Sequence, residues 1–209
     1  MSKLADNLTR YLREDGHKIW GFVVYRASYK NDEDWDKVID LIKAHARDWL
    51  SYTGAPELYD NLDITVIQDQ ADEDATTSLV REKFQQWCIE APHREQGTTP
   101  GLALRYRFCI YIDNECIESI KYNNSLPSLQ KELDRNRGFV KLINKDWEPY
   151  EPESDEEDEE IALEGCSLED VGWMRVDYIE VLTLMLPYLR DEDSWNTEYR
   201  RPPRIANCG

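Results

Sequence analysis

Two arginines and a tyrosine within residues 105–113 are the side chains best suited to bind a ligand. The segment reads Arg-Tyr-Arg-Phe-Cys-Ile-Tyr-Ile-Asp, and its alternation predicts a β-strand with Arg105, Arg107 and Tyr111 on one face. Strand geometry places alternate side chains roughly 6.5 to 7 Å apart. Two guanidinium groups at this spacing can hold a carboxylate, a phosphate or a sulfate.

Four further residues extend this candidate ligand-binding site. His93, Arg94 and Glu95 precede the predicted strand and include a candidate acid–base pair, and Arg26 ends an earlier strand. A second interpretation is that the arginines form internal ion pairs, because the chain contains 43 acidic residues. We favour internal pairs. The pattern leaves open whether the chain is an enzyme, and it assigns no catalytic residue.

The histidines and cysteines do not predict a metal or cofactor site. The three histidines are far apart in the sequence, and the five cysteines show no C-x-x-C spacing. Glycine loops that bind phosphate and a G-x-S-x-G nucleophile motif do not occur. Cys109 shares the predicted face of Arg107, downstream of His93, but a packed core thiol is the simpler interpretation. We expect free thiols in a reducing compartment, no metal and no cofactor.

The C-terminal segment is the second candidate for binding. Its sequence Tyr-Arg-Arg-Pro-Pro-Arg predicts an extended, cationic tail over residues 198–209. Tyr199, Arg200 and Arg201 could dock on a protein partner, as peptides do in aromatic-lined grooves. The alternative, which we favour, is that the tail packs against its own domain near Trp173 and Trp195.

The charge of the chain limits its partners. The net charge is −18, from 25 basic and 43 acidic residues, which disfavours DNA, RNA and anionic membranes. No apolar run approaches the roughly 18 residues of a membrane-spanning helix, and no signal segment is recognised, so we expect a cytoplasmic protein, with the nucleus left open. Eight acidic residues fall within 151–160 and predict a disordered loop over about 150–162. We hypothesise that this loop screens the arginine face or the cationic tail.

The periodicity of apolar residues predicts two strand–helix units followed by further strands. Strands are expected at 19–26, 62–67, 105–113, 139–143 and 173–178, and helices at 32–52, 77–91 and 179–189. Asn31 or Asp32 should cap the first of these helices, and Pro92 should end the second before a loop over 93–101. This order predicts a single α+β domain over 1–209. We expect a ferredoxin-like two-layer sandwich, with a mainly antiparallel sheet, helices packed on one face and a C-terminal helical extension.

Several sequence blocks carry a family resemblance. They are Trp20–Arg26, Phe84–Trp87, His93–Thr98, Arg105–Ile110, Gly165–Cys166 with Asp170–Met174, and Thr197–Pro203. Together they resemble a large family of uncharacterised intracellular proteins of filamentous fungi, over nearly the whole chain. The resemblance implies a fungal source and an intracellular location. That family has no assigned activity, so the resemblance implies no mechanism.

Two functions are compatible with these patterns. The first is a soluble intracellular interaction module of unknown specificity that binds a protein partner. The alternative is a protein for a small anionic ligand, or a cofactor-independent enzyme, with its site beside Arg105 and Arg107 and the 93–101 loop. The alternative would resemble dimeric ferredoxin-like barrels, so a homodimer is left open. The alternative would be favoured if a large cavity is lined by Arg105, Arg107, Tyr111 and His93. The interaction module would be favoured if the arginines are paired with acids inside the protein.

Overall fold

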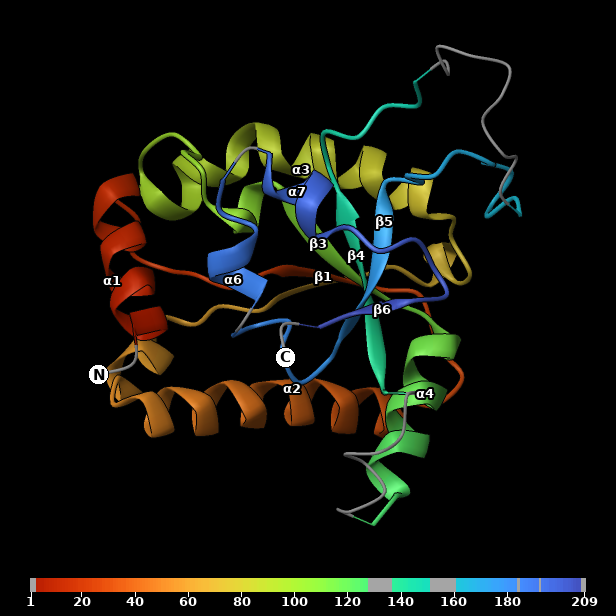
Figure 1. Cartoon of the computed structure of the whole chain (residues 1–209), viewed down its shortest axis with the longest axis horizontal. Coiled ribbons are helices and arrows are strands. Elements are labelled where there is room, and N and C mark those ends of the chain that lie inside the picture. The colour runs from red at the N-terminus through yellow and green to blue at the C-terminus, as the bar shows by residue number, and fades with distance from the viewer. Residues whose placement is uncertain (1–2, 128–136, 151–160, 184, 192, 208–209) are drawn as a thin grey trace.

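A mixed β-sheet forms the centre of the computed structural model (Figure 1). The described residues are 3–127, 137–150, 161–183, 185–191 and 193–207. Within them the sheet has six strands in the order β2-β1-β3-β4-β5-β6, namely β1 (Val23–Arg26), β2 (Thr65–Gln68), β3 (Phe108–Ile112), β4 (Phe139–Asn144), β5 (Trp173–Asp177) and β6 (Ile205–Ala206). Strand β1 pairs in parallel with β2 and β3, and β5 with β6, whereas β3, β4 and β5 are antiparallel neighbours. The chain is therefore an α+β protein.

Two helical crossovers explain why part of the sheet is parallel. Helix α2 (Asp32–Thr53) connects β1 to β2, and α3 (Thr77–Gln96) connects β2 to β3. A connection of this length returns the chain to the same end of the sheet, so the next strand runs parallel to the last. The predicted mainly antiparallel, ferredoxin-like arrangement is not confirmed, because the sheet is mixed. The apolar pattern locates strands but does not give their directions.

Helices cover both faces of the sheet, so the expectation of helices on one face is wrong (Figure 1). Along β1, Val24 belongs to one core, built with α2 and α4 (Asn114–Ser125). Its neighbours Val23 and Tyr25 belong to a second core, where α3 contributes Val80 and Phe84. Strands buried on both faces read as continuous apolar runs, as β1 and β3 do.

Helix α2 begins and ends where the sequence predicts. The side chain of Asn31 accepts hydrogen bonds from the backbone N–H groups of Glu33 and Asp34, which satisfies free donors at the start of the helix. Gly54 ends the helix in the left-handed conformation, at φ +80°.

Helix α3 continues through Pro92 instead of ending there. It extends to Gln96, and Gly97 caps it in the left-handed conformation. Pro92 and Ala91 are buried, and the Gln96 amide binds the backbone of Lys18 and Ile19. These contacts offset the hydrogen bond that proline removes. Residues 93–96 of the expected loop are therefore helical.

The predicted strand over 105–113 begins three residues late. Leu104–Tyr106 form a short 3₁₀ turn in which all three residues are buried, and β3 starts at Phe108. Arg105 and Arg107 consequently do not share a strand face, and that part of the prediction is wrong. The sequence pattern predicts that Arg105 lies on the opposite face of a strand from Tyr106. In the structure both residues are buried in a tight turn inside the protein.

The remaining helices lie near the chain ends. They are α1 (Lys3–Asp15), α6 (Met185–Tyr188) and α7 (Ser194–Glu198), with further 3₁₀ turns at Pro56–Asn61 and Gln70–Asp72. The predicted single helix over 179–189 is reduced to turns and the short α6. None of the described helices has the length and apolar character needed to cross a membrane. Residues 151–160 of the predicted acidic loop lie outside the described residues.

Candidate functional site

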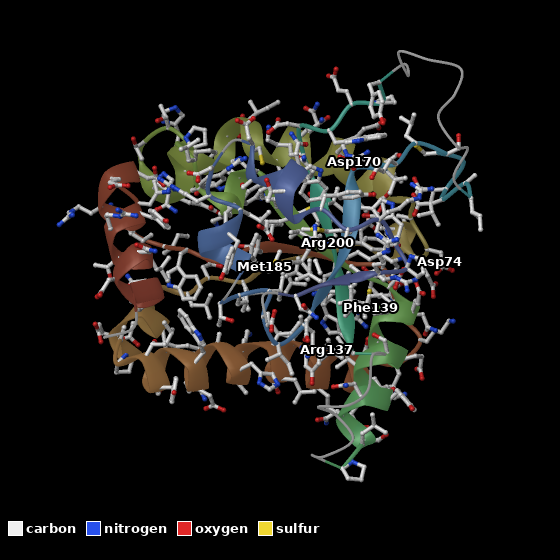
Figure 2. All side chains as sticks on the ribbon, viewed as in Figure 1. Asp74, Arg137, Phe139, Asp170, Met185 and Arg200 are labelled. Atoms are coloured by element: carbon white, nitrogen blue, oxygen red, sulfur yellow. The ribbon has the colours of Figure 1, made fainter. Side chains whose placement is uncertain are left out.

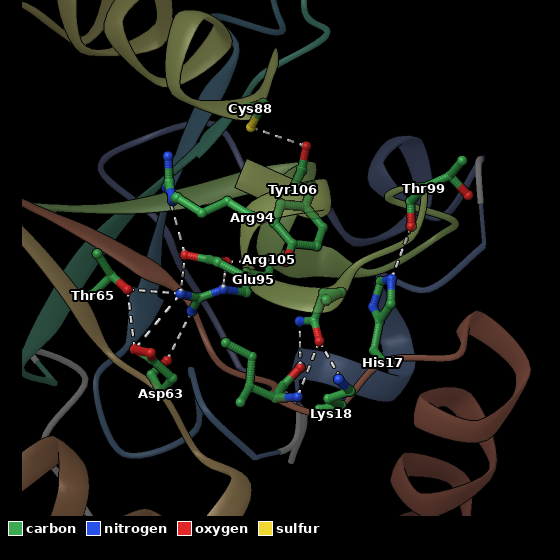
Figure 3. A network of polar contacts seen from close by, with 12 residues as sticks. His17, Lys18, Asp63, Thr65, Cys88, Arg94, Glu95, Thr99, Arg105 and Tyr106 are labelled. Atoms are coloured by element: carbon green, nitrogen blue, oxygen red, sulfur yellow. Dashed lines mark hydrogen bonds and ion pairs between the residues drawn. The ribbon is translucent and has the colours of Figure 1, made fainter. Parts of the chain in front are cut away.

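Arg105 is the centre of a buried polar cluster that also contains Glu95, Tyr106, Asp63 and Thr65 (Figure 3). Its Nε donates to Glu95 Oε2 at 2.8 Å, and its Nη2 donates to Glu95 Oε1 at 3.1 Å and to Thr65 Oγ1 at 2.7 Å. Its Nη1 donates to the Asp63 carbonyl at 3.0 Å. The Tyr106 hydroxyl donates to the same Glu95 carboxylate at 3.0 Å. We call these five residues the Arg105 cluster.

Arg105 is buried and electrostatically satisfied at the centre of the cluster, while the side chain of Asp63 is partly exposed at its edge. Arg105 is only 2% exposed. Burial acts to lower the pKa of Arg105, but the hydrogen bond and charge of Glu95 outweigh burial and raise it. Burial, with the nearby charge of Glu95, raises the pKa of Tyr106 to about 12, so this phenol stays protonated. All three guanidinium nitrogens of Arg105 donate to acceptors in the protein, so no pair of N–H groups remains to bind an anion.

A small cavity adjoins the Arg105 cluster between α1 and residues 19–21. Its walls are mostly apolar, and its edge carries an ion pair between Asp15 and Arg190. The cavity volume is about 40 Å³. This volume suits about three water molecules and is far below the several hundred Å³ of an organic ligand site.

The other candidate residues are distributed over separate parts of the molecule. Arg26, at the opposite end of β1, donates to the Ser28 carbonyl at 2.9 Å and forms an ion pair with Asp32. Arg107 donates to the Leu189 and Arg190 carbonyls at 3.1 and 2.8 Å.

Tyr111 is buried, and its hydroxyl donates to the Ala75 carbonyl at 2.7 Å. His93 and Arg94 are exposed on α3, and the Arg94 Nη2 atom lies 3.9 Å from Glu95 Oε1. The structure therefore brings together Arg94, Glu95 and Arg105 from the candidate set, and not the others.

Three of the described cysteines, Cys88, Cys109 and Cys116, have thiols that burial keeps protonated. Burial raises the pKa of Cys109 and of Cys116 well above the ordinary thiol value. Burial also raises the pKa of Cys88 to about 12. A thiol of this kind stays protonated near neutral pH, whereas the thiolate is the reactive form. Among the described residues, no group of three or more His, Cys, Asp or Glu side chains could hold a metal ion.

A second polar region is an open groove that the sequence patterns did not predict. Its volume is about 470 Å³. Four carboxylates, four aromatic rings and two asparagines line it: Asn144, Asp146, Trp147, Glu148, Tyr150, Glu169, Asp170, Trp195, Asn196 and Tyr199. We call it the acidic aromatic groove. Its residues come from the segments that follow β4, precede β5 and form α7, so only the folded sheet brings them together.

Packing from inside the protein fixes the aromatic walls of the acidic aromatic groove. The Arg81 guanidinium lies over the Trp147 ring at 4.7 Å and donates to the carbonyls of Asn144 and Gly172. Gly172 adopts φ +75°, and a Cβ atom there would overlap both Trp147 and Arg81. Trp195 stacks on the core ring of Phe108 at 5.5 Å. The rings are thus held in place before any ligand arrives.

Asp170 is the most constrained carboxylate of the acidic aromatic groove. It accepts hydrogen bonds from the Gly172 N–H and from the Trp195 indole N–H, both at 2.7 Å. Burial nevertheless raises its pKa above the ordinary value. Asp146 pairs with Lys145, but Glu148, Glu169 and Asp170 have no ion pair within the described part of the chain.

The C-terminal segment packs on its own chain. The Tyr199 hydroxyl donates to the Glu169 carbonyl at 2.9 Å and accepts from the Val171 N–H at 3.2 Å. Arg201 donates to the carbonyls of Leu168, Glu169 and Ile161. Arg200 is exposed, and its Nη1 donates to nearby backbone carbonyls (Figure 2). Of these three residues, Tyr199 lines the acidic aromatic groove.

Comparisons with family models, curated proteins and solved structures gave no match to this chain.

Proposed function

We propose that the protein is a binding module that takes up a cationic segment of a protein partner. The observation that carries this proposal is the acidic aromatic groove, where three carboxylates without an ion pair lie beside four aromatic rings. Carboxylates attract a cation, and aromatic faces attract it further through their quadrupole. The net charge of −18 adds long-range attraction for the same partner.

A catalytic role at the predicted site receives less support. The groups that would act there already bind partners within the chain: Arg105 binds Glu95, Arg107 binds carbonyls, and Tyr111 binds the Ala75 carbonyl. The cavity beside Arg105 is smaller than a substrate. The enzyme interpretation is based on an analogy with dimeric ferredoxin-like barrels, which have a mainly antiparallel sheet. The sheet of this protein does not match them, because β2, β1 and β3 are parallel.

The proposal keeps the expected cytoplasmic location and a protein as the partner, and it leaves a homodimer open. A small anionic ligand would meet both the negative charge of the chain and arginines that are already engaged. A cationic ligand would meet neither obstacle.

Calorimetric titration of the full chain with two charged peptides tests the proposal. One peptide alternates arginine with glycine, and the other alternates glutamate with glycine. We expect saturable binding of the cationic peptide that weakens as salt is raised, because salt screens exposed charges. No binding of the cationic peptide, or equal binding of both, would contradict the proposal.

A further inference from the structure

The proposed function does not specify which cationic group of the partner is recognised. The side chains of the acidic aromatic groove indicate which one. Resting on that function, we infer that the groove binds the guanidinium group of an arginine side chain in an extended peptide. The groove offers two kinds of contact at once, namely flat aromatic faces and carboxylates at several positions around them. An arginine side chain uses both, because its planar cation stacks on rings and its N–H fork pairs with carboxylates.

The spacing of the carboxylates favours an organic cation over a metal ion. The described acidic side chains do not converge in any group of three that could hold a metal. In the groove they are instead distributed around a space of about 470 Å³. A guanidinium on its aliphatic stem fits within such a space, whereas a bare metal ion would not find three of these carboxylates together.

The carboxylates retain acceptor capacity for the ligand. Asp170 accepts two hydrogen bonds, from neutral donors on Gly172 and Trp195. A carboxylate can accept about four, so capacity remains on both oxygens. Glu148 and Glu169 are exposed and have no ion pair within the described residues.

The aromatic rings explain why arginine should be preferred over lysine. Trp195 is buried and packs against Tyr199 with ring centroids 5.4 Å apart, so the ring surface that faces the groove comes from the half-buried Tyr199 and the exposed Tyr150. A weakly hydrated, planar guanidinium gives up little hydration when it stacks there, whereas a compact ammonium is strongly hydrated. The chain already contains this pairing, since the Arg81 guanidinium lies over Trp147 from inside the protein.

The nearby arginines of the chain do not supply this group. The Arg201 guanidinium is engaged with the carbonyls of Leu168, Glu169 and Ile161. Neither Arg200 nor Arg201 is among the residues that line the groove. The inferred occupant is therefore a second molecule.

Paired charge-removing variants test the inference. One variant carries Glu148→Gln and Glu169→Gln in the groove. The control carries Asp36→Asn and Asp40→Asn, which remove the same charge from exposed positions on α2, a helix that lies far from Asp170 in the view of Figure 2. Each is titrated with the arginine–glycine peptide and with a lysine–glycine peptide of equal length, after circular dichroism has established that both variants are folded.

We expect the groove variant to bind the arginine peptide about tenfold more weakly than the unsubstituted chain, and the control about twofold more weakly at most. We also expect the unsubstituted chain to bind the arginine peptide several-fold more tightly than the lysine peptide. Equal losses in the two variants would overturn the groove as the site while leaving cation binding intact. Equal affinity for the two peptides would overturn the arginine preference. Absence of binding to both cationic peptides would overturn the proposed function itself.

Discussion

The Arg105 cluster and the acidic aromatic groove contain similar side chains, but the carboxylates of the cluster are paired within the described part of the chain and those of the groove mostly are not. In the cluster, each carboxylate and guanidinium has a partner within the chain, and Arg105 is 2% exposed. In the groove, Glu148, Glu169 and Asp170 have no ion pair within the described residues, and the rings line an open space. Charged groups that pair with one another hold a fold together, whereas carboxylates without an ion pair remain available to a cation.

The comparison also shows why charge type alone is a poor guide to function. Arginines stand out in a chain of net charge −18 and suggest an anion site. In such a chain, however, arginine is the residue that finds internal acids, as Arg105 finds Glu95 and Arg26 finds Asp32. We therefore assign the proposed binding to the surplus acids and not to the arginines.

The largest expected effect is a loss of stability on breaking the Arg105 cluster. Glu95→Gln removes the closest carboxylate of the buried Arg105 and leaves the partly exposed Asp63, at 3.6 Å, as its counter-ion, so we expect it to lower the free energy of unfolding by about 3 kcal/mol. Urea unfolding followed by circular dichroism measures this loss. Glu90→Gln, an exposed change on the same helix, should stay within about 0.5 kcal/mol. An effect of Glu95→Gln as small as that of the control would show that the cluster is not structural.

A smaller loss is expected where the backbone positions the groove. Gly172→Ala places a Cβ atom against Trp147 and Arg81 at a positive φ, so we expect a destabilisation of about 2 kcal/mol and weaker binding of the arginine peptide. Thermal unfolding and calorimetry measure the two effects. Gly165→Ala is a matched control, because Gly165 has φ +85° with no atom near its Cβ position. The control should lose stability through backbone strain but retain peptide affinity, and equal affinity losses in the two variants would contradict this assignment.

The pH dependence of binding should be set partly by Asp170. Burial raises the pKa of Asp170 above 3.8, so the folded chain holds this proton more tightly than the unfolded chain does. The contribution of Asp170 to stability is thus fully present below the unfolded pKa and is lost as pH rises through the folded pKa. Cation binding has the opposite dependence, because it needs the ionised carboxylate.

We therefore expect affinity for the arginine peptide to fall about two- to fivefold as the pH decreases through the raised pKa of Asp170. Asp170→Asn should bind more weakly at neutral pH and lose less affinity on acidification. Calorimetry at a series of pH values distinguishes the two chains. Identical pH profiles would exclude Asp170 from the binding site.

The smallest effect is expected from the acidic run at 151–160. Its deletion changes the net charge from −18 to −10, since the run carries eight acidic residues. We expect slower association with the arginine peptide, by about two- to fivefold at low salt, with a difference that disappears at high salt. Stopped-flow association measures the rate. Faster association after the deletion would contradict this expectation and would indicate that the run hinders access of the peptide.

The sequence predicts local structure better than it predicts the site, for identifiable reasons. Asn31 and Gly54 mark the ends of α2 because capping depends on neighbouring residues. The directions of β1, β2 and β3 depend on whether each connection returns the chain to the same end of the sheet, and the sequence period does not contain that information. The turn at Leu104–Tyr106 has the same alternation of apolar and charged residues as a strand, so the sequence pattern does not distinguish the two.

The acidic aromatic groove could not be predicted from spacing at all. Trp147, Asp170 and Trp195 are separated by more than twenty residues at each step, and the pairing of β4 with β5 makes them neighbours. The one available signal was the number of aromatic and acidic residues in the segments after 144 and 169. The same composition also fits an ordinary solvated surface.

The most direct test of the contrast between the two regions is a nitrogen–proton NMR titration with the arginine peptide. The indole N–H of Trp195 donates to Asp170 in the groove, and the Nε–H of Arg105 donates to Glu95 in the cluster. We predict that the Trp195 resonance shifts saturably with added peptide while the Arg105 resonance stays unchanged. A saturable shift of Arg105 with no change at Trp195 would contradict the account.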